Sequence, residues 1–157
     1  MTGQDLVAVW ATPDSFAPYG ALVPVPQDGA RVPLPETFPG ERTAGEPRLA
    51  MNAIAPAAGA VPLMLERHPY SVQMFVPLGE EPLLAVVASP DLDRPGRGDL
   101  RAFKIPARHA VVYRAGTWHL GMAALTGPTA FAVFIRRMAD GRDTEFFDLQ
   151  GVAEIVV

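Results

Sequence analysis

Prolines and glycines interrupt this chain so often that it has no room for long helices. The 157 residues include 17 prolines and 14 glycines, and these are spread along the whole length. Proline lacks a backbone N–H donor and glycine favours turns, so both residues end regular elements. No stretch keeps a helical apolar period beyond two turns. Many short apolar runs between such breaks predict an all-β sandwich or barrel with few short helices.

The apolar runs predict where the strands lie. Extended segments are expected at residues 5–11, 21–25, 48–55, 61–66, 72–76, 83–88, 100–105, 110–113, 130–135 and 145–149. One short helix is expected after residue 12, because Thr12 can cap the first turn and Pro13 suits the first helical position. The Pro-rich segment 27–47 is predicted to be a loop or an arm that packs on a neighbour. The apolar tail 152–157 is predicted to be buried, with a second subunit as one candidate cover.

Composition restricts the class of protein further. A length of 157 residues predicts a single domain over residues 1–157, and 49% hydrophobic residues are enough for a core. The net charge is −4 without any basic block, which argues against nucleic acid as a partner. With no cysteine, disulfides and thiolate chemistry are excluded. Residues 1–5 carry no positive charge and precede no long apolar run, so we expect a cytoplasmic protein without a membrane span.

The histidines are few, and two of them have the spacing of metal ligands. Glu66 and His68 are one residue apart, so on a strand both point to the same side. Gln73 could face the same interior from the next strand, and His119 could do so after the turn at Gly116. These four side chains form a plausible site for one divalent ion, for which nickel, manganese, iron and zinc are all chemically suitable.

A purely structural interpretation of the same residues is also open. A single histidine near a strand end is commonly a hydrogen-bonded structural residue, and the third histidine, His109, opens an apolar strand. Glu66 could pair with an arginine, and Gln73 could bond a backbone group. The joint spacing of the four residues, rather than any one of them, supports the site.

The motifs around these residues resemble the two cupin blocks. Glu66 and His68 stand at the positions of the first two histidines, and Gln73 stands at the position of the glutamate. Within the cupins, the chain resembles the ureidoglycolate lyase family. The resemblance is carried by Glu-Arg-His-Pro at 66–69, Gln-Met-Phe-Val-Pro at 73–77, Asp-Leu-Arg-Ala-Phe at 99–103 and Gly-Thr-Trp-His at 116–119.

This resemblance implies a cupin-like β-barrel of the double-stranded β-helix or jelly-roll type, acting as a homodimer. The implied activity is cleavage of ureidoglycolate to glyoxylate and urea in purine and allantoin breakdown, with a divalent metal, often nickel, in some members. We expect the catalytic residues to be His68, His119 and Glu66, and the metal ligands to be Glu66, His68, Gln73 and His119. The residues expected to bind the small carboxylate substrate are Arg101, Arg114, Gln73 and Trp118.

Two positions depart from the family pattern. Members often carry a histidine directly after Trp-His, where this chain has Leu120, and another after the tyrosine, where it has Arg114. These differences leave an alternative open, in which the same barrel acts on, or only binds, another small hydroxy- or oxo-acid.

Overall fold

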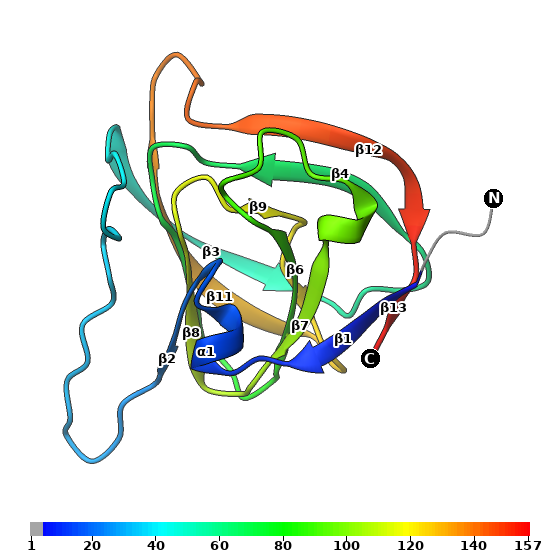
Figure 1. Ribbon diagram of the computed structural model, residues 1–157. Helices are drawn as coiled ribbons and strands as arrows, with labels where there is room; N and C mark the ends of the chain where they lie inside the picture. The colour runs from blue at the N-terminus through cyan, green and yellow to red at the C-terminus, as the bar shows by residue number, and fades with distance from the viewer. Residues whose placement is uncertain (1–4) are drawn as a thin grey trace.

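Two β-sheets lie face to face and form most of the molecule (Figure 1). The computed structural model describes residues 5–157. The larger, eight-stranded sheet has the order β12-β4-β9-β6-β7-β1-β13, with β10 beside β6, and the five-stranded sheet has the order β2-β8-β5-β11-β3. The strands are β1 (Leu6–Trp10), β2 (Gly20–Pro24), β3 (Glu46–Ile54), β4 (Val61–Arg67), β5 (Gln73–Pro77), β6 (Leu83–Ala88), β7 (Arg101–Ile105), β8 (His109–Tyr113), β9 (Trp118–His119), β10 (Ala123–Ala124), β11 (Thr129–Arg137), β12 (Glu145–Ala153) and β13 (Ile155–Val156). The predicted all-β, cupin-like barrel is confirmed.

The core has two layers because the side chains of a strand alternate between its faces. Every residue of β6 is buried. Leu83, Ala85 and Val87 belong to an inner cluster between the two sheets. Leu84, Val86 and Ala88 belong to an outer cluster on the opposite face of the larger sheet. A side chain of this sheet therefore points either into the barrel or into the outer cluster, and this choice decides which residues can share a site.

Most expected elements are present close to their predicted positions. The short helix α1 (Pro13–Phe16) is capped by Thr12, whose hydroxyl accepts a hydrogen bond from the backbone N–H of Ser15. Gly20 opens β2, where any Cβ would collide with the carbonyl oxygen of Val112. The two-residue strands β9 and β10 and the 3₁₀ helix η1 (Arg97–Asp99) were not predicted. They are too short to produce a periodic sequence signal.

The Pro-rich segment 27–47 is a loop, as predicted, up to the start of β3 at Glu46, and it packs on its own chain. Leu34 and Phe38 cover Val72, Met74 and Phe134 on the outer face of the five-stranded sheet. In Figure 1 this segment runs along the left side of the barrel. The C-terminal tail is only partly buried.

The tail pairs with the start of the chain, as β13 lies parallel to β1. Ala153 is buried, but Val156 and Val157 are exposed. Residues 1–4, on which part of the expectation about targeting rests, lie outside the described residues.

Candidate metal centre

Strand pairing brings Glu66 and His119 together at the inner face of the larger sheet. β4 and β9 are antiparallel, and Glu66 lies directly opposite His119. His68 follows the end of β4, two residues after Glu66, and so returns to the same side. Leu65 and Trp118, which neighbour them in sequence, belong to the outer cluster. The predicted convergence of Glu66, His68 and His119 is therefore present.

The three side chains converge on one carboxylate oxygen. Glu66 Oε1 lies 3.2 Å from His119 Nε2 and 4.0 Å from His68 Nε2. The two imidazole rings are tilted against each other with their centroids 5.3 Å apart. One ligand atom from each of the three residues lies within 4.8 Å of the others. Both rings are buried, whereas Glu66 keeps 30% of its side chain exposed.

The other ring nitrogens determine what these atoms can bind. His119 Nδ1 lies 2.8 Å from the carbonyl oxygen of Thr117. His68 Nδ1 lies 3.3 Å from that of Asp143. Because a carbonyl oxygen only accepts hydrogen bonds, we assign the ring proton of His68 to Nδ1. His119 faces an acceptor at both ring nitrogens, since its Nε2 lies 3.2 Å from the carboxylate of Glu66.

His68 then keeps a lone pair at Nε2, 4.0 Å from Glu66 Oε1, and this buried nitrogen has no hydrogen-bond partner among residues 5–157. Nε2 of His119 lies within hydrogen-bond distance of the same carboxylate oxygen. Two imidazole nitrogens and a carboxylate are a donor set that suits a divalent metal ion, which would replace the hydrogen bond between His119 and Glu66. The residues present therefore fit a metal of the predicted kind.

Electrostatics keeps His68 and Glu66 in the ligand form at neutral pH. Burial is the largest cause that lowers the pKa of His68 to about 4, and the neighbouring His119 lowers this pKa further. The hydrogen bond from His119 lowers the pKa of Glu66 from its usual value of 4.5, although burial opposes this shift. His68 is thus neutral and Glu66 ionised at pH 7, as a metal ligand must be.

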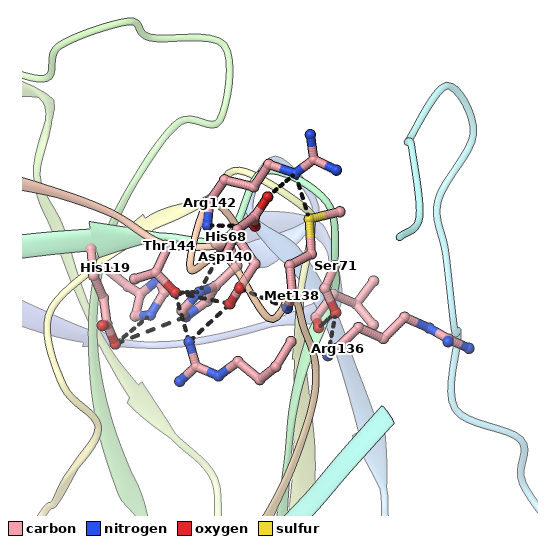
Figure 2. Close-up of polar contacts among 12 residues, drawn as sticks. His68, Ser71, His119, Arg136, Met138, Asp140, Arg142 and Thr144 are labelled. Carbon is pink, nitrogen blue, oxygen red and sulfur yellow. Dashed lines mark hydrogen bonds and ion pairs between the residues drawn. The ribbon is translucent and has the colours of Figure 1, made fainter. Parts of the chain in front are cut away.

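Residues of the turn before β12 contact the ring of His68 at Nδ1 (Figure 2). Thr144 lies next to His68, with Oγ1 3.3 Å from Nδ1. The buried carboxylate of Asp143 accepts hydrogen bonds from the backbone of Met138 and from the guanidinium of Arg137. Although burial raises the pKa of Asp143, these hydrogen bonds hold it below its usual value. The turn therefore orients the outer partners of His68, which fix its tautomer.

A cavity of about 600 Å³ opens in front of Glu66 and His119. Its walls are largely apolar and include Phe75, Met122, Phe131, Val133 and Ile135. Gln73 also lines the cavity, and its Oε1 is buried without a hydrogen-bond partner. The described lining residues do not include His68, which lies behind the wall. Gln73 therefore faces the same interior as the triad, as its position predicted.

The hydroxyl of Tyr113, like His68 Nε2 and Gln73 Oε1, is buried without a hydrogen-bond partner among the described residues. Tyr113 lies on β8, opposite Gln73 on β5, and its ring centroid is 4.8 Å from that of His119. Burial, with a smaller contribution from the charge of Glu66, raises the pKa of this phenol. Tyr113 therefore stays protonated at neutral pH and retains an unused hydrogen-bond donor beside His119.

Three residues expected to bind substrate lie away from this cavity. Arg101 donates hydrogen bonds to the carbonyl oxygens of Gly98 and Leu100 and lines a different depression beside β1. Arg114 donates to the carbonyl oxygen of Ala17 and stacks on Phe38.

Trp118 points into the outer cluster because His119, the next residue on the same strand, points inward. The structure does not bring Arg101, Arg114 and Trp118 to the candidate site. Leu120 also belongs to the outer cluster. The two departures from the family pattern, at Arg114 and Leu120, therefore lie outside the cavity.

Three polar residues that the sequence did not single out line the cavity instead: Arg48 and Asn52 on β3, and Arg137 at the end of β11. For Arg137 the sequence does carry a signal, which is the alternation of side chains along β11. Phe131, Val133 and Ile135 face the cavity at every second position, and Arg137 continues that series.

These features define a class: cupin-like β-barrel proteins with an imidazole–carboxylate centre, able to hold a divalent metal at the wall of a small-molecule cavity. Residues 41–155 match the family described as ureidoglycolate lyase. The chain belongs to this family.

Curated relatives agree over nearly the full length. The chain is 31% identical to a ureidoglycolate lyase of Brucella anthropi, over 92% of this chain and 90% of that protein. It is 32% identical to a ureidoglycolate lyase of Stutzerimonas stutzeri, over 87% of this chain and 85% of that protein. Among solved structures, a dTDP sugar isomerase from Desulfovibrio desulfuricans aligns with a TM-score of 0.45 and 19% identity, over 84% of this chain and 83% of that one.

Proposed function

We propose that this protein is an enzyme that cleaves ureidoglycolate to glyoxylate and urea. One observation of the structure supports the proposal most directly: the Nε2 atoms of His68 and His119 converge on the carboxylate of Glu66 at the wall of a cavity. The relatives that carry the name ureidoglycolate lyase align over most of the chain. These comparisons favour ureidoglycolate over the alternative of another small hydroxy- or oxo-acid.

The reaction needs one proton to move and one bond to break. Ureidoglycolate has a hydroxyl, a carboxylate and a urea nitrogen on the same carbon. The hydroxyl loses its proton, its oxygen forms the carbonyl of glyoxylate, and the carbon–nitrogen bond breaks. The electron pair of that bond goes to the urea nitrogen, which takes up a proton. No water is consumed, so the enzyme class is a carbon–nitrogen lyase.

In this proposal Glu66, His68 and His119 hold a divalent metal such as nickel, manganese or zinc, with Gln73 as a further oxygen donor. When bound, such an ion would lower the pKa of a hydroxyl group next to it. Glu66 and His119 line the cavity and are the catalytic groups that can contact a substrate there. His68 is the buried third member and would supply Nε2 as a ligand atom from behind the cavity wall.

The tyrosine beside His119 offers a hydrogen-bond donor for the same reaction. The hydroxyl of Tyr113 has no partner within the described chain and stays protonated at neutral pH. A hydrogen bond from this hydroxyl would stabilise negative charge that develops on the substrate. Gln73 lines the cavity beside Glu66 and His119, and Tyr113 lies behind it, opposite Gln73 on the neighbouring strand.

The test is direct turnover. Purified protein is incubated with ureidoglycolate, and glyoxylate and urea are measured separately, with elemental analysis of the same preparation. We expect equimolar products and a bound divalent metal, and we expect turnover to stop after chelation and to return after metal is added. Absence of turnover at every metal loading would refute the activity. Full activity in metal-free protein would refute the metal site alone.

We further propose that residues 1–157 act as a single domain, that the protein is a cytoplasmic homodimer, and that it serves purine and allantoin breakdown. Exposed valines on β1 and at the C-terminus support the dimer, since Val7 and Val156 are neighbours in the β1–β13 pair. Within residues 5–157, no helix has the length and apolarity needed to cross a membrane. Sedimentation analysis and cell fractionation test the dimer and the compartment.

A further inference from the structure

Two arginines lie side by side on the inner face of the five-stranded sheet. Arg48 on β3 is directly opposite Ile135 on β11, so Arg137, two residues further on, is its diagonal neighbour on the same face. Diagonal neighbours across an antiparallel pair are about 7–8 Å apart at Cα, within reach of long side chains. Both arginines line the cavity that also holds Glu66 and His119. Their neighbours in sequence, Leu49 and Arg136, occupy the opposite face.

The hydrogen-bonding capacity of this pair is largely unused. The guanidinium of Arg48 donates one hydrogen bond, from Nη1 to the carbonyl oxygen of Pro47, and makes no ion pair with another described residue. Arg137 uses only Nη1, which donates to Asp143 and Thr144. A guanidinium carries five N–H donors, so both side chains retain several for another acceptor.

Two like charges on adjacent strands destabilise each other unless an anion compensates them. Asp143 compensates Arg137 and holds it in place, since its carboxylate lies 3.1 Å from Nη1. Arg48 has no such partner. The two arginines therefore have the arrangement of an anion-binding site. Asp143 holds Arg137 in place, whereas the guanidinium of Arg48 keeps most of its donors for a ligand.

We infer that Arg48 and Arg137 bind the carboxylate of the substrate, the role that the sequence suggested for Arg101 and Arg114. The inference rests on the proposed function, and it makes the inner face of β3 and β11 responsible for selecting small carboxylates. A planar guanidinium binds a carboxylate through two parallel hydrogen bonds, and such charge-assisted pairs are stronger than neutral ones. The reacting carbon, attached to that carboxylate, then lies between the arginines and the wall formed by Glu66 and His119.

The experiment measures binding without turnover. Glyoxylate and its neutral amide, glyoxylamide, are compared as ligands by calorimetry on the protein as purified. The decisive variant is Arg48→Gln, because residue 48 is exposed on an edge strand and its replacement leaves the core intact. The control is Arg136→Gln, which removes the same charge from the neighbouring strand but on its other face. Arg48→Lys keeps the charge and loses the planar fork.

We expect the wild-type protein and the Arg136→Gln variant to prefer glyoxylate strongly over glyoxylamide. In Arg48→Gln this preference should fall by about tenfold, with Arg48→Lys between the two. In steady-state assays with ureidoglycolate the loss should appear mainly in KM. An unchanged preference in Arg48→Gln, or an equal loss in Arg136→Gln, would overturn the inference.

The outcomes separate this inference from the proposed function. If ureidoglycolate is cleaved but Arg48→Gln binds both ligands as the wild type does, the carboxylate site is wrong and the activity stands. If no ureidoglycolate is cleaved but Arg48→Gln selectively loses glyoxylate binding, the carboxylate site stands and the assigned substrate is wrong.

Discussion

The two faces of the β4–β9 pair carry similar kinds of side chains but use them differently. On the outer face, Arg67 pairs with Glu145 and stacks on Trp118, and the indole N–H of Trp118 donates to the carbonyl oxygen of Leu92. On the inner face, Glu66, His68 and His119 converge, and His68 Nε2 has no hydrogen-bond partner within the described chain. A polar cluster with all its hydrogen bonds satisfied stabilises the fold. A buried polar atom without a partner, such as His68 Nε2, needs a ligand to complete it.

The strongest test of this difference between the two faces replaces one residue on each face. His119→Ala should reduce kcat/KM for ureidoglycolate by about 10²–10⁴-fold, because a ligand or proton-transfer group is lost. Trp118→Phe changes the next residue on the same strand but only on the outer face. It should lower the thermal midpoint without a comparable loss of activity. Equal activity losses in the two variants would remove the distinction between the faces.

A second test uses the titration of the inner face in metal-free protein. The pKa of His68 is about 4 in the folded chain, below the ordinary value of 6.5. Between these pH values the unfolded chain binds a proton that the folded chain does not. Stability should therefore fall as the pH falls from 6.5 to 4, by about 3 kcal/mol from His68 alone.

Urea unfolding at several pH values measures this effect. The variant His68→Gln should lose this part of the pH dependence, while His109→Gln, which changes a histidine outside the cavity, should retain it. The same pH slope in His68→Gln and in the wild type would show that another group is responsible.

The third test compares two carboxylates on opposite faces. Glu66→Gln removes the only formal negative charge among the three converging groups and should weaken divalent metal binding by roughly 100-fold. Glu145→Gln removes a carboxylate from the outer face and should leave the metal affinity unchanged. Competition with a chromophoric chelator gives both affinities. If both variants bind metal as the wild type does, the triad is not the metal site.

The smallest effect is expected on the outer face itself. Arg67→Met removes a partly exposed ion pair and a cation–π contact, which together should cost about 1 kcal/mol of stability. Denaturant unfolding measures the cost, and ureidoglycolate turnover should stay unchanged. A loss of turnover at constant stability would mean that the outer face contributes to the reaction.

Part of the site could be predicted because two of its residues, Glu66 and His68, obey a local rule. Glu66 and His68 are one residue apart, and the alternation of a strand places them on one side whatever the remaining fold is. The same rule excludes Trp118 from a site that contains His119, since adjacent residues of a strand point to opposite faces. The prediction that Trp118 binds substrate did not take this alternation into account. Arg101 and Arg114 were predicted to bind substrate from their charge alone, and the charge of a side chain does not show where that side chain points.

The sequence by itself determined most of the strands, the capped turn at Thr12 and the placement of Glu66 and His68 on one side, because these depend on neighbours along the chain. Only the tertiary structure decided that Arg48 and Arg137 share the cavity with His119. Their proximity depends on the register between β3 and β11 and on how the two sheets face each other. Such contacts join residues far apart in sequence, and the packing of the whole barrel sets them.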